Sequence, residues 1–172
     1  MPTPPKDLQE VYKLKSNDCS GFLKEAGRVL ELPPGLVPDK NADGIIDSIS
    51  NGSGGWINLG QGSGVAGQAI AAAKQGYLVV ALLKAADHLP FRLNRKTGKY
   101  DIPHPYSHGH VAIVLPYFGR ESYPLVVCGS IAVDGKSPGD KAVRGVWRGV
   151  DAPNVSYYRS PGVVPKLKAA YQ

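Results

Sequence analysis

The sequence predicts a single α+β domain built on an antiparallel sheet. Its 172 residues, 42% hydrophobic and 20% charged, fit one globular domain. Residues at helical spacing come first along the chain and apolar, strand-like runs come later, an order that favours α+β with an antiparallel sheet. The 21 glycines and 15 prolines favour many turns and a loop-rich architecture over a helical bundle.

The N-terminal part is predicted to be helical after a loose start. Residues 1–8 have the proline-rich composition of a flexible tail, and a short helix is compatible with residues 6–15. A clear helix then begins behind Asn17 or Asp18, because either side chain can cap it and apolar residues recur behind it at helical spacing. The sequence Pro-Pro-Gly at residues 33–35 ends this helix.

Two further helices precede the strands. They are predicted over residues 42–49 and 65–74, and the second ends at Gly76. The continuous apolar run 77–83 predicts a central strand that is buried on both faces. The other predicted strands are residues 110–115 and 125–132, with weaker candidates at 143–150 and 156–159.

The connection between the first two strands, residues 85–107, contains a predicted hairpin. Residues 91–102 alternate around a glycine-containing turn, which is typical of two short antiparallel strands. Four cations lie on it: Arg92, Arg95, Lys96 and Lys99. The hairpin is either a solvated surface feature or a flap over a functional site, since it leads directly into the strand that begins at His110.

The net charge of +6 indicates either solubility or attraction to a polyanion. Nucleic acid is not the expected partner, because the chain has no zinc-finger spacing, no aromatic RNA-binding motif and no concentrated basic helix. An anionic glycan–peptide polymer fits the charge equally well. The N-terminus has no apolar leader and no segment reaches the ~20 apolar residues of a membrane span, so we expect synthesis in the cytoplasm and no membrane insertion.

Residues 18–22, Asp-Cys-Ser-Gly-Phe, place a thiol at the start of the best-defined helix. A helix N-terminus stabilises a thiolate through its unpaired N–H groups and the helix dipole, and a nearby imidazolium would lower the pKa further. The same N–H groups, with that of Cys19, predict an oxyanion hole. Asp18 is the candidate cap, and the small residues Ser20 and Gly21 would let a substrate backbone approach closely.

His110 is the predicted partner of Cys19, as general base. It follows Gly109 and begins an apolar strand, where an imidazole can face a cleft while the strand holds it. Cysteine and histidine are the two halves of a cysteine hydrolase site, and a fold must bring them together because they are distant in sequence. His88 and His104 lie in the predicted loop, and we assign them surface roles.

A third group should orient the imidazole. Cys128, on the strand after that of His110, lies at a plausible position, with Ser130, Asp134 or a backbone carbonyl as alternatives. Cys19 and Cys128 are the only cysteines, which excludes a disulfide scaffold. We predict that they are too far apart or badly oriented to bridge, because a disulfide would consume the nucleophile.

Two alternatives remain open at this point. His108 and His110 could bind zinc from one face of a strand in a cell-wall peptidase, with His104, Asp101 or Asp87 as the third ligand that such a site requires. Alternatively, the chain is a non-catalytic, basic wall-binding module. The cysteine chemistry itself needs no metal and no organic cofactor.

Several of these motifs, taken in order, resemble one known family. The nucleophile segment Asn17–Phe22 is similar to that of the type VI secretion amidase effectors, family 1, and Gly109–Val114 resembles the histidine strand of that family. The resemblance covers roughly residues 17–160 and extends to the segments 76–84, 123–125, 128–132, 145–147 and 157–158.

The resemblance implies a compact, papain-like fold of the NlpC/P60 type and an enzyme that cuts Gram-negative peptidoglycan stem peptides between D-glutamate and meso-diaminopimelate. It implies that Cys19 is the nucleophile, His110 the general base and Cys128 the third-position residue. It further implies an antibacterial toxin that is made in the cytoplasm and injected by the type VI apparatus into a rival's periplasm. A cognate immunity protein would block its active site. The hairpin segment 85–107 is longer than the corresponding family connection.

Overall fold

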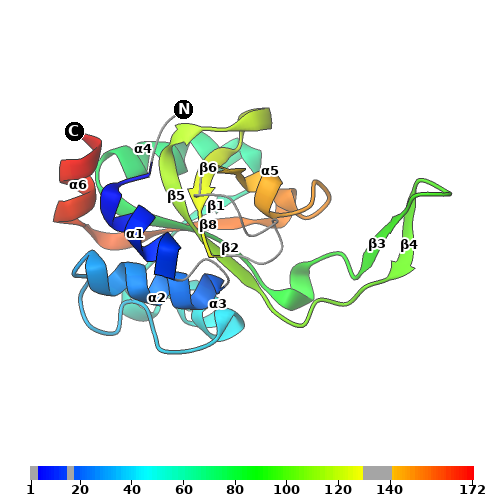
Figure 1. Cartoon of the computed structure of the whole chain (residues 1–172), viewed down its shortest axis with the longest axis horizontal. Helices are drawn as coiled ribbons and strands as arrows, with labels where there is room; N and C mark the ends of the chain where they lie inside the picture. The colour runs from blue at the N-terminus through cyan, green and yellow to red at the C-terminus, as the bar shows by residue number, and fades with distance from the viewer. Residues whose placement is uncertain (1–3, 15–17, 130–140) are drawn as a thin grey trace.

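The structure is a computed structural model that describes residues 4–14, 18–129 and 141–172. It consists of a six-stranded sheet with helices on both faces and a separate two-stranded hairpin that projects from one end (Figure 1). All neighbouring strands pair antiparallel, which confirms the predicted α+β class with an antiparallel sheet. No helix within the described ranges has both the length and the apolar character needed to cross a bilayer.

The central strand of the sheet is the predicted apolar run. The strands, in their spatial order, are β1 (Ile57–Gln61), β8 (Ser156–Val163), β2 (Tyr77–Leu83), β5 (His110–Phe118), β6 (Pro124–Val127) and β7 (Lys141–Ala142). Strand β2 lies between β8 and β5, and its residues from Leu78 to Leu83 are all buried. Every one of these side chains is apolar, as expected for a strand that is covered on both faces.

Two apolar cores separate the molecule into three layers. Leu78, Val80 and Leu82 of β2 face one core, whereas the alternate residues of the strand face the other. The first core is covered by α1 (Lys6–Leu14), α2 (Cys19–Val29), α3 (Ala42–Ser50) and α6 (Pro165–Tyr171), and the second by α4 (Ala66–Lys74) and α5 (Val143–Val146). Short 3-10 turns connect the elements: η1 (Ser53–Gly55), η2 (Ser63–Val65), η3 (Ala85–Asp87), η4 (Arg120–Ser122) and η5 (Ala152–Asn154).

Two sequence predictions are wrong in detail, and one strand was not predicted. The expected tail over residues 1–8 is too long, because α1 begins at Lys6 and Leu8 is fully buried. The weak strand candidate at 143–150 begins instead with the helix α5, whose Val143 packs in the second core. Strand β1 was not predicted, since its apolar pattern is short and is interrupted by a bulge before Gly60.

The predicted hairpin is present, as β3 (Phe91–Asn94) and β4 (Lys99–Pro103), paired from Phe91–Pro103 to Asn94–Lys99. It extends away from the main sheet (Figure 1). All four of its predicted cations are exposed, and none lines the pocket described below. The expected flap of Arg92, Arg95, Lys96 and Lys99 is therefore an outward-pointing arm in this conformation.

Candidate active site

Cys19 is the first residue of α2, and Asp18 caps the helix as predicted. Asp18 has extended backbone angles (φ −141°, ψ 104°), and its carboxylate accepts hydrogen bonds from the Gly21 N–H at 2.8 Å and the Ser20 hydroxyl at 2.9 Å. A Cβ at position 21 would collide with the Asp18 carboxylate, so glycine permits this close cap. Asn17, the alternative cap, lies outside the described residues.

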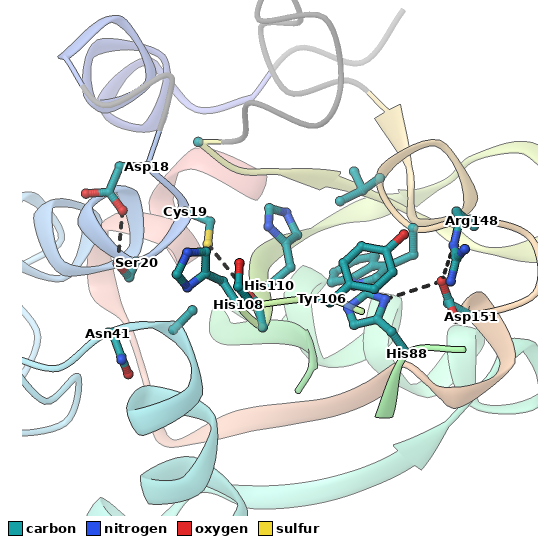
Figure 2. Close-up of a pocket in the computed structure, with 16 residues that line it drawn as sticks. Asp18, Cys19, Ser20, Asn41, His88, Tyr106, His108, His110, Arg148 and Asp151 are labelled. Carbon is teal, nitrogen blue, oxygen red and sulfur yellow. Dashed lines mark hydrogen bonds and ion pairs between the residues drawn. The ribbon is translucent and has the colours of Figure 1, made fainter. Parts of the chain in front are cut away.

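Cys19 and His110 line the same pocket, which has a volume of about 590 Å³. Figure 2 shows Cys19, His108 and His110 on one side of the pocket, which we call the thiol wall, and His88, Tyr106, Arg148 and Asp151 on the other, which we call the arm wall. The volume falls within the range of small-molecule and peptide sites. The fold thus assembles the two predicted halves of the site in one concave surface.

The start of β5 is held tightly against α3 and β2. His110 pairs with Leu83 in the sheet, and a Cβ on the preceding Gly109 would lie 2.5 Å from Asp43 Oδ1 and 3.0 Å from the carbonyl oxygen of Leu83. Only glycine fits without displacing the strand. The Gly109 carbonyl oxygen lies 4.0 Å from Cys19 Sγ, although the two residues are 90 positions apart in sequence.

Burial sets the protonation state of both predicted catalytic groups. It raises the pKa of the Cys19 thiol, although the N–H groups of Val111, Ser20 and Cys19 itself favour the thiolate. Burial also lowers the pKa of His110 to about 4, with a smaller contribution from the nearby His88. Burial therefore favours the neutral thiol and the neutral imidazole in the resting site.

His110 is packed rather than hydrogen-bonded. Its ring meets Trp147 edge to face, with centroids 5.1 Å apart and an interplanar angle of 73°. Although the residue as a whole keeps some exposure, its Nε2 is buried and has no hydrogen-bond partner within the described chain. The strand and Trp147 therefore hold the ring, and no orienting side chain is seen among the described residues.

Cys128, the predicted third-position residue, is buried in the second core, on the face of the sheet covered by α4, and Trp147 of the same core contacts the His110 ring. Its neighbour Gly129 lines the pocket, but Cys128 does not. The role of Cys128 in orienting the imidazole stays a prediction. No disulfide joins Cys19 and Cys128. The other candidates, Ser130 and Asp134, lie outside the described residues.

The oxyanion-hole prediction needs a correction at two positions. The Gly21 N–H is already donated to the Asp18 carboxylate, and Asp18 is an acceptor, so neither can stabilise an oxyanion. The N–H groups of Cys19 and Ser20 are oriented to favour negative charge on Sγ, and Val111 of β5 supplies a third such N–H. Val111 carries no side-chain signal that could have revealed this from sequence.

The arm wall was missed by sequence reasoning. His88, assigned to the surface, is 8% exposed, and its Nδ1 lies 3.3 Å from Asp151 Oδ2. Arg148 donates from Nε to the same carboxylate oxygen at 2.7 Å, and the Leu89 N–H donates to Asp151 Oδ1 at 2.8 Å. Tyr106 stacks on His88 with centroids 4.1 Å apart.

These contacts favour the ionised form of Asp151 and attach the start of the hairpin to the rest of the protein. Burial opposes ionisation, but hydrogen bonds from Arg148, the Leu89 N–H and His88 hold the pKa of Asp151 below its ordinary value. Arg148 also donates to the carbonyl oxygens of Phe91 at 2.5 Å and Leu89 at 2.6 Å. One buried carboxylate and one guanidinium therefore tie the hairpin to the body of the protein.

The geometry bears on the alternative zinc site as well. In the described ranges, no three histidine, cysteine or carboxylate side chains gather in an arrangement that could hold a metal ion. His108 and His110 both line the pocket, but His104, Asp101 and Asp87 do not. What the pocket does bring together is one thiol, three imidazoles and backbone N–H groups, the elements of nucleophilic and general-base chemistry.

No family model matches the chain, and a search of curated proteins finds no similar sequence.

Proposed function

We propose that the chain is a cysteine hydrolase of papain-like, NlpC/P60-type fold that cleaves peptidoglycan stem peptides between D-glutamate and meso-diaminopimelate. The observation that carries the proposal is the convergence of Cys19, at a capped helix start, and His110, at the start of a central strand, in one open pocket. The bond and the polymer come from the resemblance of the nucleophile and histidine segments to the amidase effectors.

The reaction begins from a neutral pair. Sγ of Cys19 attacks the scissile carbonyl carbon as His110 accepts the thiol proton, and the carbonyl π electrons move to the oxygen. A base whose resting pKa is about 4 is weak. The negative charge that develops beside the ring stabilises the imidazolium, so the ring becomes a stronger base as the transition state forms.

The N–H groups near Sγ then stabilise the oxyanion. Those of Cys19, Ser20 and Val111 are available for this role because they already favour negative charge at that place. Collapse of the tetrahedral intermediate breaks the C–N bond, and His110 returns its proton to the leaving amine. Water, deprotonated by His110, hydrolyses the thioester and regenerates the thiol.

By the same resemblance, we propose an antibacterial role. The protein would be made in the cytoplasm, delivered by the type VI secretion apparatus into the periplasm of a target cell, and neutralised in the producer by a cognate immunity protein. The net charge of +6 suits a carboxylate-bearing polymer such as peptidoglycan.

Mass spectrometry of purified Gram-negative sacculi digested with the wild type and with Cys19→Ala tests the proposal. The wild type should release two kinds of fragment, one that ends in D-glutamate and one that begins with diaminopimelate. Cys19→Ala should lose at least about 10³-fold in rate. Cys128→Ala compares the second thiol, which does not line the pocket, and should lose far less activity than Cys19→Ala.

Three outcomes would contradict the proposal: cleavage by folded Cys19→Ala, cleavage at a different bond, or loss of activity with a chelator but not with a thiol-alkylating reagent. The last result would favour zinc chemistry at His108 and His110 instead. Circular dichroism of each variant shows whether a loss of activity reflects a loss of fold.

A further inference from the structure

His88 presents a buried polar atom that the cysteine mechanism does not use. Its side chain is 6% exposed, and its Nε2 is buried with no hydrogen-bond partner in the described part of the chain. The residue lines the same pocket as Cys19 and His110, and Figure 2 shows its ring at the arm wall. A buried polar atom without a partner is costly, so an unpaired nitrogen at a pocket indicates a place that a ligand can satisfy.

Asp151 determines what kind of ligand this nitrogen can take. An ionised carboxylate can only accept hydrogen bonds, and Asp151 already accepts from Arg148 Nε and the Leu89 N–H. The contact of 3.3 Å with His88 Nδ1 therefore requires the proton to be on Nδ1. In the neutral ring, Nε2 then carries a lone pair, so it accepts a hydrogen bond and does not donate one.

The ring is held in place on more than one side, as a binding group should be. Asp151 fixes its edge, and Asp151 is itself fixed by Arg148 and by the backbone of the arm. Tyr106 lies flat on the ring, with an interplanar angle of 18°, and also stacks under Arg148 at 4.9 Å. Because Nε2 is buried in this conformation and its lone pair lies in the ring plane, a ligand reaches it only when a group at the ring edge moves, while Tyr106 keeps the ring face covered.

We propose that His88, held by Asp151, is a substrate-binding residue of the Cys19 pocket, and that its Nε2 accepts a hydrogen bond from an N–H group of the peptide substrate. This inference rests on the proposed function and deepens it, since it names the second wall of the pocket as the one that recognises the substrate. The proposed substrate offers several N–H donors, and two of them belong to the diaminopimelate residue at the cleaved bond and can be removed one at a time: the scissile amide N–H and the side-chain ammonium.

The test uses the full chain carrying Cys19→Ala, which binds the stem peptide without cleaving it, with its histidines labelled with nitrogen-15. On addition of the tetrapeptide L-Ala-γ-D-Glu-meso-diaminopimelate-D-Ala, the Nε2 resonance of His88 should shift as a nitrogen that gains a hydrogen bond. A peptide with 2-aminopimelate in place of diaminopimelate, which lacks the side-chain amine, and a peptide methylated on the scissile amide nitrogen distinguish the two donors. The shift should disappear with the peptide that lacks the donor used.

Variants separate binding from structure. His88→Phe keeps a ring against Tyr106 but has no nitrogen, and it should raise KM at least tenfold with kcat changed less than about threefold. His88→Gln can donate to Asp151 through its amide nitrogen and accept through its oxygen, so it should restore most of the affinity. His104→Phe, an exposed histidine of the same arm that meets Tyr106 edge to face, is the matched control and should bind as the parent does.

The inference fails if the His88 resonance stays in place while the peptide binds, or if folded His88→Phe binds and turns over the peptide as well as the parent. These outcomes leave the proposed function intact, because wild-type cleavage that depends on Cys19 would still be seen. No binding to Cys19→Ala and no cleavage by the wild type would instead overturn the proposed function, and this inference with it. If His88→Phe does not fold, the resonance shift alone decides.

Discussion

The two walls of the pocket are held in place in opposite ways. The thiol wall depends on secondary structure: the start of α2 places Cys19, and strand pairing with Leu83 places His110. The arm wall depends on side chains, with Asp151 and Arg148 joining His88 and the carbonyl oxygens of the arm. A single substitution can therefore dismantle the arm wall, whereas the thiol wall persists as long as α2 and β5 persist.

The difference extends to hydrogen bonding. Among the described residues, the His110 ring contacts Trp147 and its Nε2 has no partner, and Cys19 Sγ lies near the Gly109 carbonyl and backbone N–H groups, so no other side chain occupies the reactive atoms. Asp151 and Arg148, in contrast, are fully engaged with each other and with the backbone. Reactive groups are left with few partners and supporting groups are saturated, which is the division expected if the first wall does chemistry and the second binds and positions.

The largest expected effect separates the two imidazoles of the thiol wall. His110→Gln should reduce kcat/KM on muropeptides by about 10²–10⁴-fold, the usual contribution of a general base. His108→Gln should cost less than about tenfold, because His108 precedes β5 and is exposed. Steady-state kinetics on a purified muropeptide measure both. The reverse order of losses would make His108 the base.

The next largest effect is expected on the free energy of unfolding when the arm wall is disrupted. Asp151→Ala should lower the free energy of unfolding by about 3 kcal/mol, because it leaves Arg148, His88 and the Leu89 N–H without their buried acceptor. Asp47→Ala, which removes the exposed partner of Lys84, should cost no more than about 1 kcal/mol. Urea unfolding of both variants measures the difference, and equal losses would show that burial of the Asp151 pair adds nothing.

The pH dependence of activity and of stability tests whether His110 is a buried, neutral ring. His110 works as a base only when neutral, so activity should persist at pH 5 and fall to half near its folded-state pKa of about 4. Because this pKa lies below the ordinary value, the stability that the neutral ring contributes is complete above about pH 6.5 and is lost as the pH falls toward 4. Rates and circular dichroism measured together at each pH separate the two effects. An acid limb near pH 6.5 would contradict the buried, neutral ring.

The smallest effect is expected on the arm itself. Serine at Arg92, Arg95, Lys96 and Lys99 should change the free energy of unfolding by less than about 0.5 kcal/mol, since all four are exposed. The variant should bind sacculi more weakly and with less salt dependence. Lys74→Ser with Lys168→Ser, exposed cations outside the arm, is the control for net charge. Equal loss of binding per charge removed, or unchanged kinetics on intact sacculi, would leave the arm without a specific role.

Much of the fold was predictable from local pattern. The cap at Asp18, the helices near 42–49 and 65–74, the buried strand 77–83 and the hairpin all depend on residues within a few positions of one another. Strand β1 has few apolar residues and a bulge, so its sequence pattern does not predict a strand, and the valines of α5 suit a strand as well as a helix.

The sequence by itself determined that Cys19 begins a helix and that His110 begins an apolar strand, because caps and apolar spacing act over short distances. Only the tertiary structure decided that His88 and Asp151, 63 positions apart, form the opposite wall, and that Cys128 faces the other core. It also decided the direction in which the pKa values of Cys19 and His110 move, since both shifts follow from burial. Burial and long-range pairing depend on how the whole chain packs, and no local spacing encodes them.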